Sequence, residues 1–247
     1  MTLLIALWIA SSSFVAAQEA LPGARPALLE QMACAPSGHP VPPLAGLVVL
    51  GGYVQGRIMF GPGDAVIINA GTIQGLQRGQ QFFVRRPIRD ASMKQPKVGA
   101  LYGVHTAGWL TVVDVKDTMA VGQVTHACDG ILEGDFLEPY VAPVTPMAAL
   151  TGTADYQHPG QIMMADERRQ TGHAGLLMLM NLGSEHDVRA GHLLTIYRET
   201  LSGQGPIVDV GRATVLSVTG QSSLVRIDSS RQAVYVGDFV AIHRITP

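Results

Sequence analysis

Two cysteines and eight histidines are the side chains of this 247-residue sequence best suited to covalent or metal chemistry. Neither Cys34 nor Cys128 belongs to a Cys-x-x-Cys motif or a zinc-type cysteine–histidine spacing, so no zinc site is predicted. In an exported chain, an even number of cysteines favours a disulfide bond. A Cys34–Cys128 disulfide is therefore predicted, and two unpaired buried thiols are the alternative.

The remaining polar residues do not form a catalytic pattern. The closest histidines, His186 and His192, are six positions apart, a spacing that neither a helix nor a strand brings together. Asp114 and Asp117 flank a predicted hairpin turn, where carboxylates are usually solvated rather than perturbed for acid–base chemistry. Gly-x-Ser-x-Gly, His-Glu-x-x-His and phosphate-binding loop motifs are absent from the sequence. We therefore expect a protein that is not an enzyme and has no cofactor or metal site.

Trp109 is the candidate for contact with a partner. It begins a predicted strand, Trp109–Val115, and its equivalent in a second, similar segment is Arg212. A position that tolerates charge is expected at the surface, and exposed aromatic side chains are enriched at binding hot spots. The alternative is a tryptophan that lies partly under a long loop between residues 86 and 108.

The similar segments form an internal repeat, which is the strongest organisational signal in the sequence. Pairs of identical residues recur at an offset of 112 and then, after a longer loop in the first copy, at an offset of 103: Asn69/Asn181, Gly71/Gly183, Gly79/Gly191, Arg86/Arg198, Gly108/Gly211, Gly134/Gly237 and Asp135/Asp238. Apolar positions between them keep the same register. The pattern predicts a tandem duplication of one small domain.

The sequence of each copy predicts a series of short strands joined by turns. A strand at Ala65–Asn69, or Leu176–Met180, is followed by Asn-x-Gly, where glycine is expected to adopt a left-handed turn conformation. We predict structural turns at Gly71, Gly79, Gly183 and Gly191 and a buried plug at Leu76 and Val188. The side chains of Asp135 and Asp238 are predicted to accept hydrogen bonds from nearby backbone amides. About six strands per copy predict an all-β fold made of two small barrel-like domains.

The N-terminal region predicts export. Residues 1–17 form an apolar stretch that ends in Val15-Ala16-Ala17, as in a signal peptide, but no lysine or arginine precedes Arg25. Either the α-amino group supplies the positive charge or the true start codon lies elsewhere; an N-terminal core helix is the alternative. The stretch is too short to cross a bilayer, so no transmembrane segment is predicted in the mature chain.

The remaining boundaries follow composition. Residues 18–43 are rich in proline and are expected to form an extended leader, because so many prolines disfavour a regular helix. The first barrel-like domain is assigned to 44–141, a linker to 142–153 and the second domain to 154–247. The net charge of −2, without a cluster of basic residues, argues against nucleic acid as a partner.

The combined pattern of an apolar strand, Asn-x-Gly, a glycine-rich turn, aromatic-Val-x-Arg, a valine-rich hairpin and Gly-Asp-Phe resembles a known group of domains. It is similar to β-barrel repeats of bacterial envelope proteins, including proteins that carry LysM domains and the C-terminal region of flagellar assembly protein T. The resemblance covers residues 63–140 and 173–244 and implies an envelope protein or a peptidoglycan-associated partner.

These observations lead to a functional expectation. We expect a non-catalytic periplasmic or cell-envelope protein that acts as a structural element or adaptor through protein–protein contacts. A peptidoglycan- or carbohydrate-binding module with a groove between the two barrels is the first alternative, and an enzyme of unrecognised type is the second.

Overall fold

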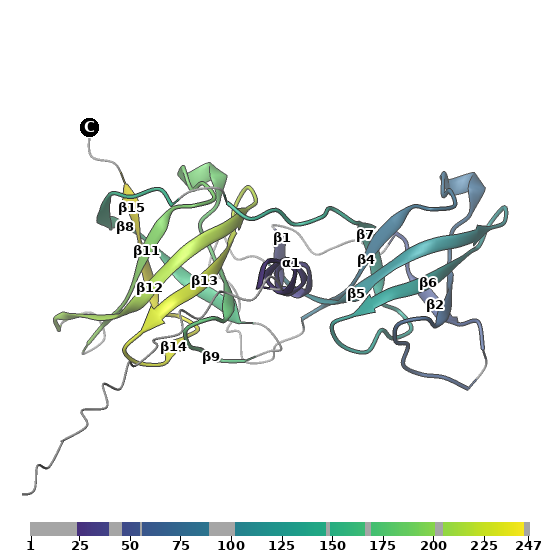
Figure 1. Ribbon diagram of the computed structural model, residues 1–247, viewed down its shortest axis with the longest axis horizontal. Coiled ribbons are helices and arrows are strands. Elements are labelled where there is room, and N and C mark those ends of the chain that lie inside the picture. The colour runs from purple at the N-terminus through teal and green to yellow at the C-terminus, as the bar shows by residue number, and fades with distance from the viewer. Residues whose placement is uncertain are drawn as a thin grey trace, which may run out of the picture.

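The computed structural model describes residues 24–39, 46–54, 56–88, 102–146, 149–165, 169–200 and 205–244. The predicted signal peptide, residues 1–17, lies outside the described residues, as does the centre of the predicted loop between residues 86 and 108. Within the described part the fold is all-β, as expected, with one α-helix and short 3-10 turns. Two barrels lie side by side along the long axis of the molecule, and the helix α1 lies between them (Figure 1).

The first barrel is an antiparallel sheet with the strand order β2-β3-β6-β5-β4-β7. Its strands are β2 (Val49–Gly52), β3 (Ala65–Ile68), β4 (Gln81–Pro87), β5 (Tyr102–Val115), β6 (Ala120–Ala127) and β7 (Phe136–Pro139), with a 3-10 turn, η1 (Thr72–Gln74). The two edges of the sheet meet through a bridge between Val48 and Phe136. The Val49 amide donates to the Asp135 carbonyl across the same seam.

The second barrel is closed, with the strand order β8-β10-β13-β12-β11-β15. Its elements are β8 (Thr153–Ala165), β10 (Leu177–Met180), the 3-10 turn η3 (Ser184–His186), β11 (Leu193–Glu199), β12 (Ile207–Val218), β13 (Ser223–Ser230) and β15 (Phe239–Arg244), with a separate pair, β9 (Thr171–Gly172) and β14 (Val234–Tyr235). When β8 is matched to β2 and β15 to β7, the strand order is the same in both barrels.

Each barrel has its own apolar core, to which alternate residues of the strands contribute. Leu76 and Val188, which follow the 3-10 turns, are both buried in these cores. Their burial agrees with the predicted buried plug. Because each core is separate, either barrel can bury apolar surface from its own strands.

The turns at Gly71 and Gly183 differ from the expectation of a left-handed backbone. Their φ angles of −140° and −132° lie in the extended region, which other residues also adopt. Glycine is needed there for space, because a Cβ atom on Gly71 would lie 2.0 Å from the carbonyl oxygen of Lys116. The left-handed residues are Gly79 and Gly191, with φ angles of 89° and 93°.

The Gly-Asp-Phe segments place a carboxylate inside each barrel. Asp135 is 2% exposed; its Oδ1 accepts from Arg86 Nε at 2.7 Å and its Oδ2 from Arg86 Nη2 at 2.8 Å. The Leu132 amide also donates to Asp135 Oδ2, at 2.8 Å. In the second barrel, Asp238 accepts from Arg198 and from a backbone amide in the same arrangement. The hydrogen bonds with these carboxylates raise the pKa of both arginines.

The leader differs from the predicted extended segment. It forms α1 (Ala24–Cys34), followed by the short strand β1 (Ser37–His39). The prolines are placed so that they permit the helix: Pro26 lies in the first turn, where amide groups have no intrahelical acceptor, and the next proline, Pro36, follows the last turn. The interval between Pro26 and Pro36 contains no proline, so a helix can form there although the leader as a whole is rich in proline.

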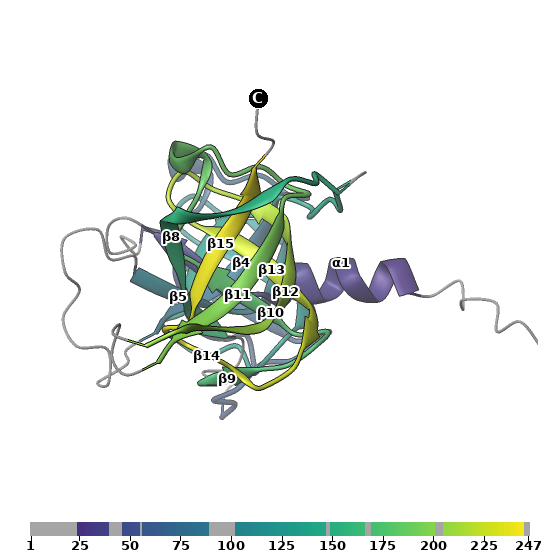
Figure 2. The same cartoon turned by 90° about the vertical axis from the view of Figure 1, so that its left-hand side faces the viewer.

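The leader connects the two barrels. Strand β1 pairs with β5 of the first barrel, and Thr106 Oγ1 donates to the Ala35 carbonyl at 3.0 Å. On its other side, α1 packs against the outer surface of the second barrel through a cluster of apolar side chains: Leu28, Leu29, Met32, Ala35, Leu177, Leu216 and Leu224. The first half of α1 projects beyond the barrels (Figure 2).

Strand β5 begins earlier than the predicted strand at Trp109. Its first residues, from Tyr102, pair with β1 and with the end of β4, so the loop of the first copy is shorter than expected. A Cβ atom on Gly103 would lie 1.9 Å from Met164 Cε, so this strand also contacts β8 of the second barrel. The residues of β5 that precede Trp109 therefore contact both the leader and the second barrel.

Candidate functional site

The predicted disulfide between Cys34 and Cys128 is confirmed. Cys34 is the last residue of α1 and Cys128 follows β6, with a Cα–Cα distance of 5.5 Å. The bond ties the leader to the first barrel on the side opposite to its contact with the second. Disulfide bonds persist in oxidising compartments, so this pair indicates such an environment.

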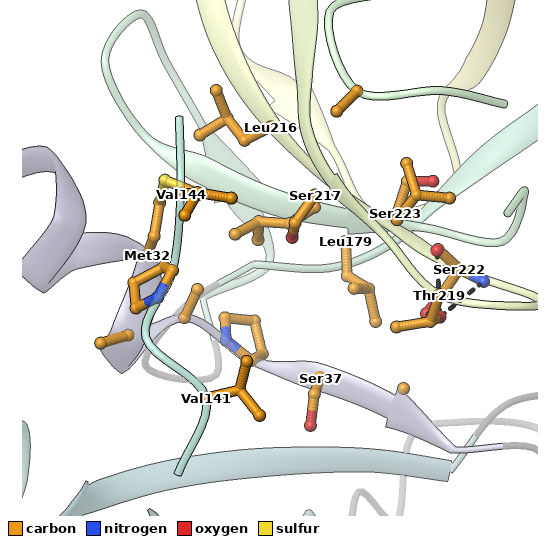
Figure 3. A pocket seen from close by; sticks show the side chains of 18 of the residues that line it. Met32, Ser37, Val141, Val144, Leu179, Leu216, Ser217, Thr219, Ser222 and Ser223 are labelled. Carbon is orange, nitrogen blue, oxygen red and sulfur yellow. Dashed lines mark hydrogen bonds between the residues drawn. The ribbon is translucent and has the colours of Figure 1, made fainter. Parts of the chain in front are cut away.

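A cleft of about 560 Å³ lies between the barrels (Figure 3). The leader and the linker segment 141–146 form one side of it, and the outer surface of the second barrel forms the other. In Figure 3, Met32, Val141 and Val144 face Leu179 and Leu216 across this space. Hydroxyl groups gather at one end, where Thr219 Oγ1 and Ser222 Oγ lie 2.8 Å apart. The cleft is thus apolar, with a polar end.

An ion cluster lies where this cleft continues into an adjoining hollow of about 420 Å³. Arg85 Nε lies 3.1 Å from Glu138 Oε2, and His39 Nε2 lies 3.5 Å from Glu138 Oε1. Burial lowers the pKa of Arg85, although Glu138 acts in the opposite direction. Burial also lowers the pKa of His39. The Glu138 carboxylate thus lies close to two basic side chains, Arg85 and His39, at the junction of the leader and the first barrel.

Ser37, His39 and Glu138 are the residue types of a nucleophilic triad, but they lack its geometry. Ser37 Oγ, at 3.3 Å, and Glu138 both approach the same nitrogen, His39 Nε2. A triad requires the hydroxyl and the carboxylate on opposite ring nitrogens, so that the base is oriented while it accepts the proton. Ser37 Oγ also accepts a hydrogen bond from Arg85, which occupies a lone pair that a nucleophile would need for attack. This cluster fixes the leader and does not resemble an acyl-transfer site.

Trp109, the predicted contact residue, lies in an aromatic cluster on the outside of the first barrel and is half-buried. Its ring stacks on His126, with centroids 4.2 Å apart and an interplanar angle of 12°. Tyr140 and Phe83 pack against it at 5.7 and 6.5 Å. The rings bury much of one another's surface, so less of Trp109 is free for a partner than the sequence suggested.

A group of exposed apolar side chains lies elsewhere, at the end of β2 and in the segment that leads to β3. Five large apolar side chains within ten positions have exposed fractions of 45–85%: Leu50, Tyr53, Val54, Ile58 and Met59. We name residues 50–54 and 56–59, which comprise the end of β2 and part of the segment after it, the apolar loop. Sequence reasoning missed it because an apolar run next to a strand is normally expected to be buried.

The two histidines rejected as a metal pair have a structural role. His186 Nδ1 accepts from the Gly183 amide at 3.3 Å, and His192 Nδ1 accepts from the Arg189 amide at 3.2 Å. In the first barrel, the side chains of Gln74 and Gln80 accept from the equivalent amides. The alignment of histidine with glutamine in the repeat was a usable signal, since both side chains offer an acceptor that can reach the backbone amide three positions earlier.

Comparisons with known proteins give this chain no family. The sequence matches no protein-family model, and comparison with curated proteins finds no significant match. In the part of the chain that the structure describes, no helix has the length and apolar character needed to span a membrane.

Proposed function

We propose that this chain is a non-catalytic structural or adaptor protein of the cell envelope, periplasmic or otherwise exported, that acts through protein–protein contacts. The disulfide supports an oxidising compartment. The apolar loop is the observation that carries the proposal, because five large apolar side chains are exposed within a short stretch of sequence, and apolar surface left exposed on a folded protein marks an interaction site.

The position of the apolar loop suits an external partner. It lies at the end of the first barrel that faces away from the second barrel, so a partner reaches it without displacing the leader (Figure 1). Arg57, the basic residue within the loop, is paired with Asp64. The patch therefore carries little unpaired charge and fits a protein surface that is itself apolar.

The free energy available from burial of the apolar loop is sufficient for binding. Complete burial of one large apolar side chain contributes roughly 1.5–3 kcal/mol. Partial burial of five such side chains offsets the cost of association, which is on the order of 4–15 kcal/mol. The leader, which holds both barrels, would keep a second partner on the other barrel at a fixed separation.

Site-specific photocrosslinking tests the proposal. A benzophenone amino acid at Ile58, introduced in cells that naturally make the protein, should give a discrete crosslinked band in the envelope fraction. The matched control is Ile73, which is 71% exposed in the turn η1 of the same barrel. Val54→Asp should abolish the crosslink from position 58 without loss of thermal stability, since Val54 is 65% exposed. Equal crosslinking from both positions, or no effect of Val54→Asp, would contradict the proposal.

The composition of the cleft weighs against the carbohydrate-binding alternative. Sugar rings pack their C–H faces on flat aromatic side chains. Among the described residues that line the cleft, Phe83 is the single aromatic residue, and its ring is engaged by Tyr140 at 4.6 Å and by Arg85. Co-sedimentation with purified peptidoglycan checks this alternative directly: binding that Val54→Asp leaves intact would favour it.

A further inference from the structure

The Cys34–Cys128 bond lies beside two more side chains that are common metal ligands. A ring nitrogen of His126 and the two sulfur atoms lie within 4.8 Å of one another. Glu30 Oε1 lies 3.3 Å from His126 Nε2. Two sulfur atoms and an imidazole therefore gather where the leader meets the first barrel, and the Glu30 carboxylate lies beside the imidazole, outside this group of three.

Secondary structure explains this convergence. Glu30 and Cys34 are four positions apart on α1, so they lie on the same face of the helix. His126 is in β6 and Cys128 directly follows the strand, and their donor atoms lie within 4.8 Å of each other. Each element thus supplies one sulfur atom and one further donor, and the packing of α1 on the barrel brings the two pairs together.

We propose that the reduced form of this protein binds one zinc ion through Cys34, Cys128 and His126, with Glu30 as the fourth ligand. A dithiol reductant transfers two electrons and two protons to the disulfide. The S–S bond breaks, two cysteine thiols form, and the reductant becomes a disulfide. Zinc then displaces the two thiol protons and forms two Zn–S bonds. In the oxidised form the sulfur atoms are bonded to each other, and the site is closed to the metal.

The separation of the nitrogen and oxygen donors is compatible with a tetrahedral ion. Zinc lies about 2.3 Å from sulfur and about 2.0–2.2 Å from nitrogen or oxygen, so a nitrogen and an oxygen on one ion are about 3.4 Å apart. The distance between His126 Nε2 and Glu30 Oε1 is 3.3 Å. The two sulfur atoms would separate to about 3.8 Å, which side-chain rotation can supply because both cysteines are only partly buried.

The surroundings hold the donors in place but leave an entry path. Trp109 stacks on His126 and restrains the orientation of its ring. The side chains of His126 and Glu30 are 27% and 56% exposed, so an ion can enter from solvent. Zinc would preserve the link between the leader and the first barrel in a chain that has not yet been oxidised.

Cobalt titration of the full-length chain tests the site. The protein is reduced with a phosphine under anaerobic conditions and titrated with Co²⁺, which reports tetrahedral thiolate coordination by its charge-transfer and visible absorption. We expect one Co²⁺ per chain in the reduced protein, displacement by Zn²⁺, and no such absorption in the oxidised protein. Absence of stoichiometric binding by a reduced chain that retains its circular dichroism spectrum would overturn the proposal.

Variants identify the ligands. His126→Ala should weaken Co²⁺ binding by about tenfold or more, since even outer-shell substitutions cost about 10–100-fold. The matched control is His173→Ala, because His173 is an exposed histidine that contacts the neighbouring Ala174 carbonyl. In a Trp8→Phe background, Co²⁺ should also quench Trp109 fluorescence. Unchanged affinity in both His126→Ala and Glu30→Gln would show that the cysteines act alone and would refute the four-ligand site.

Discussion

Replacement of Asp135 by asparagine tests the importance of the buried arginine–carboxylate pair. Asp135 Oδ1 accepts from Arg86 Nε, and Oδ2 accepts from both Arg86 Nη2 and the Leu132 amide. Asparagine keeps the shape of the side chain but replaces one acceptor oxygen by an amide donor. In the variant at least one donor therefore faces another donor, and the positive charge of Arg86 loses its nearer counter-ion, leaving Asp129 Oδ2 at 4.0 Å from Nη1.

The expected loss of stability can be worked from these contacts. One hydrogen bond to a charged group contributes about 1.5–3 kcal/mol. Removal of one partner from a buried ion pair costs about 3–5 kcal/mol, because the other charge is left uncompensated. The Arg86 side chain is 21% exposed and Asp129 lies 4.0 Å from it, so water and a second carboxylate compensate part of this charge, and the lower end of the range applies. We expect the free energy of unfolding of the first barrel to fall by about 3 kcal/mol.

Urea unfolding monitored by Trp109 fluorescence measures this loss, because Trp109 lies in β5 of the first barrel. With a slope of about 1–3 kcal/mol per molar urea, the midpoint should fall by about 1–3 M. The control is Asp114→Asn, since Asp114 pairs with Lys116 at 3.3 Å and the two side chains are 55% and 76% exposed. Its effect should stay below about 0.5 kcal/mol. An Asp135→Asn loss no larger than that of the control would refute the reasoning.

Three further predictions concern other parts of the fold. Cys34→Ser should lower stability by about 4–5 kcal/mol in the chain-entropy model, because the disulfide spans 94 residues; guanidinium unfolding and a mass measurement of free thiols at Cys128 check this. Burial, with nearby arginines, lowers the pKa of His192, so the unfolded chain binds its proton more readily and stability should fall as pH drops below about 6.5. His192→Gln, the residue of the first barrel at this position, should reduce that loss in urea unfolding at pH 7.5 and 5; an unchanged pH dependence would contradict it. Gly71→Ala should cost about 1–3 kcal/mol by thermal unfolding, because its Cβ would overlap the backbone, whereas Gly61→Ala meets no atom within 4 Å and should be nearly neutral.

The repeat in the sequence was informative because it reflects local backbone requirements. Asn69 Oδ1 accepts from the Val48 amide and Asn181 Oδ1 from the Gln161 amide, each at 2.7 Å. These hydrogen bonds join residues within one barrel, so both copies retain them. The correspondence between the two copies could therefore be predicted from the sequence. The same strand order follows, although duplication of one domain stays an interpretation.

Contacts between the leader and the barrels could not be predicted in this way. His126 had no signal of its own, since its neighbours Cys34 and Glu30 reach it only through packing of α1 on the barrel. The local spacings, Glu30 to Cys34 and His126 to Cys128, were visible but did not indicate that the two pairs meet. The predicted disulfide was the one feature that implied their proximity.

The apolar loop was beyond prediction for a different reason. Apolar composition near Val49 favours a strand, and β2 does begin there. The strand ends at Gly52, where a Cβ atom would lie 2.5 Å from the ring of Phe60. The residues after Gly52 are outside the strand, so alternation of side chains between the two faces of a sheet no longer buries half of them. Their exposure therefore depends on where strand pairing ends.

The leader also has a consequence for the order in which the protein is completed. It is synthesised before either barrel, yet Met32 packs against Leu224 of β13, nearly the whole length of the chain away. Closing so long a loop is entropically costly, so contacts at high sequence separation form slowly. Each barrel can fold during synthesis, whereas the apolar side of α1 is covered only after the last strands of the second barrel have been made. A nascent chain halted after the first barrel would therefore expose Leu28, Leu29 and Met32 to chaperones and proteases.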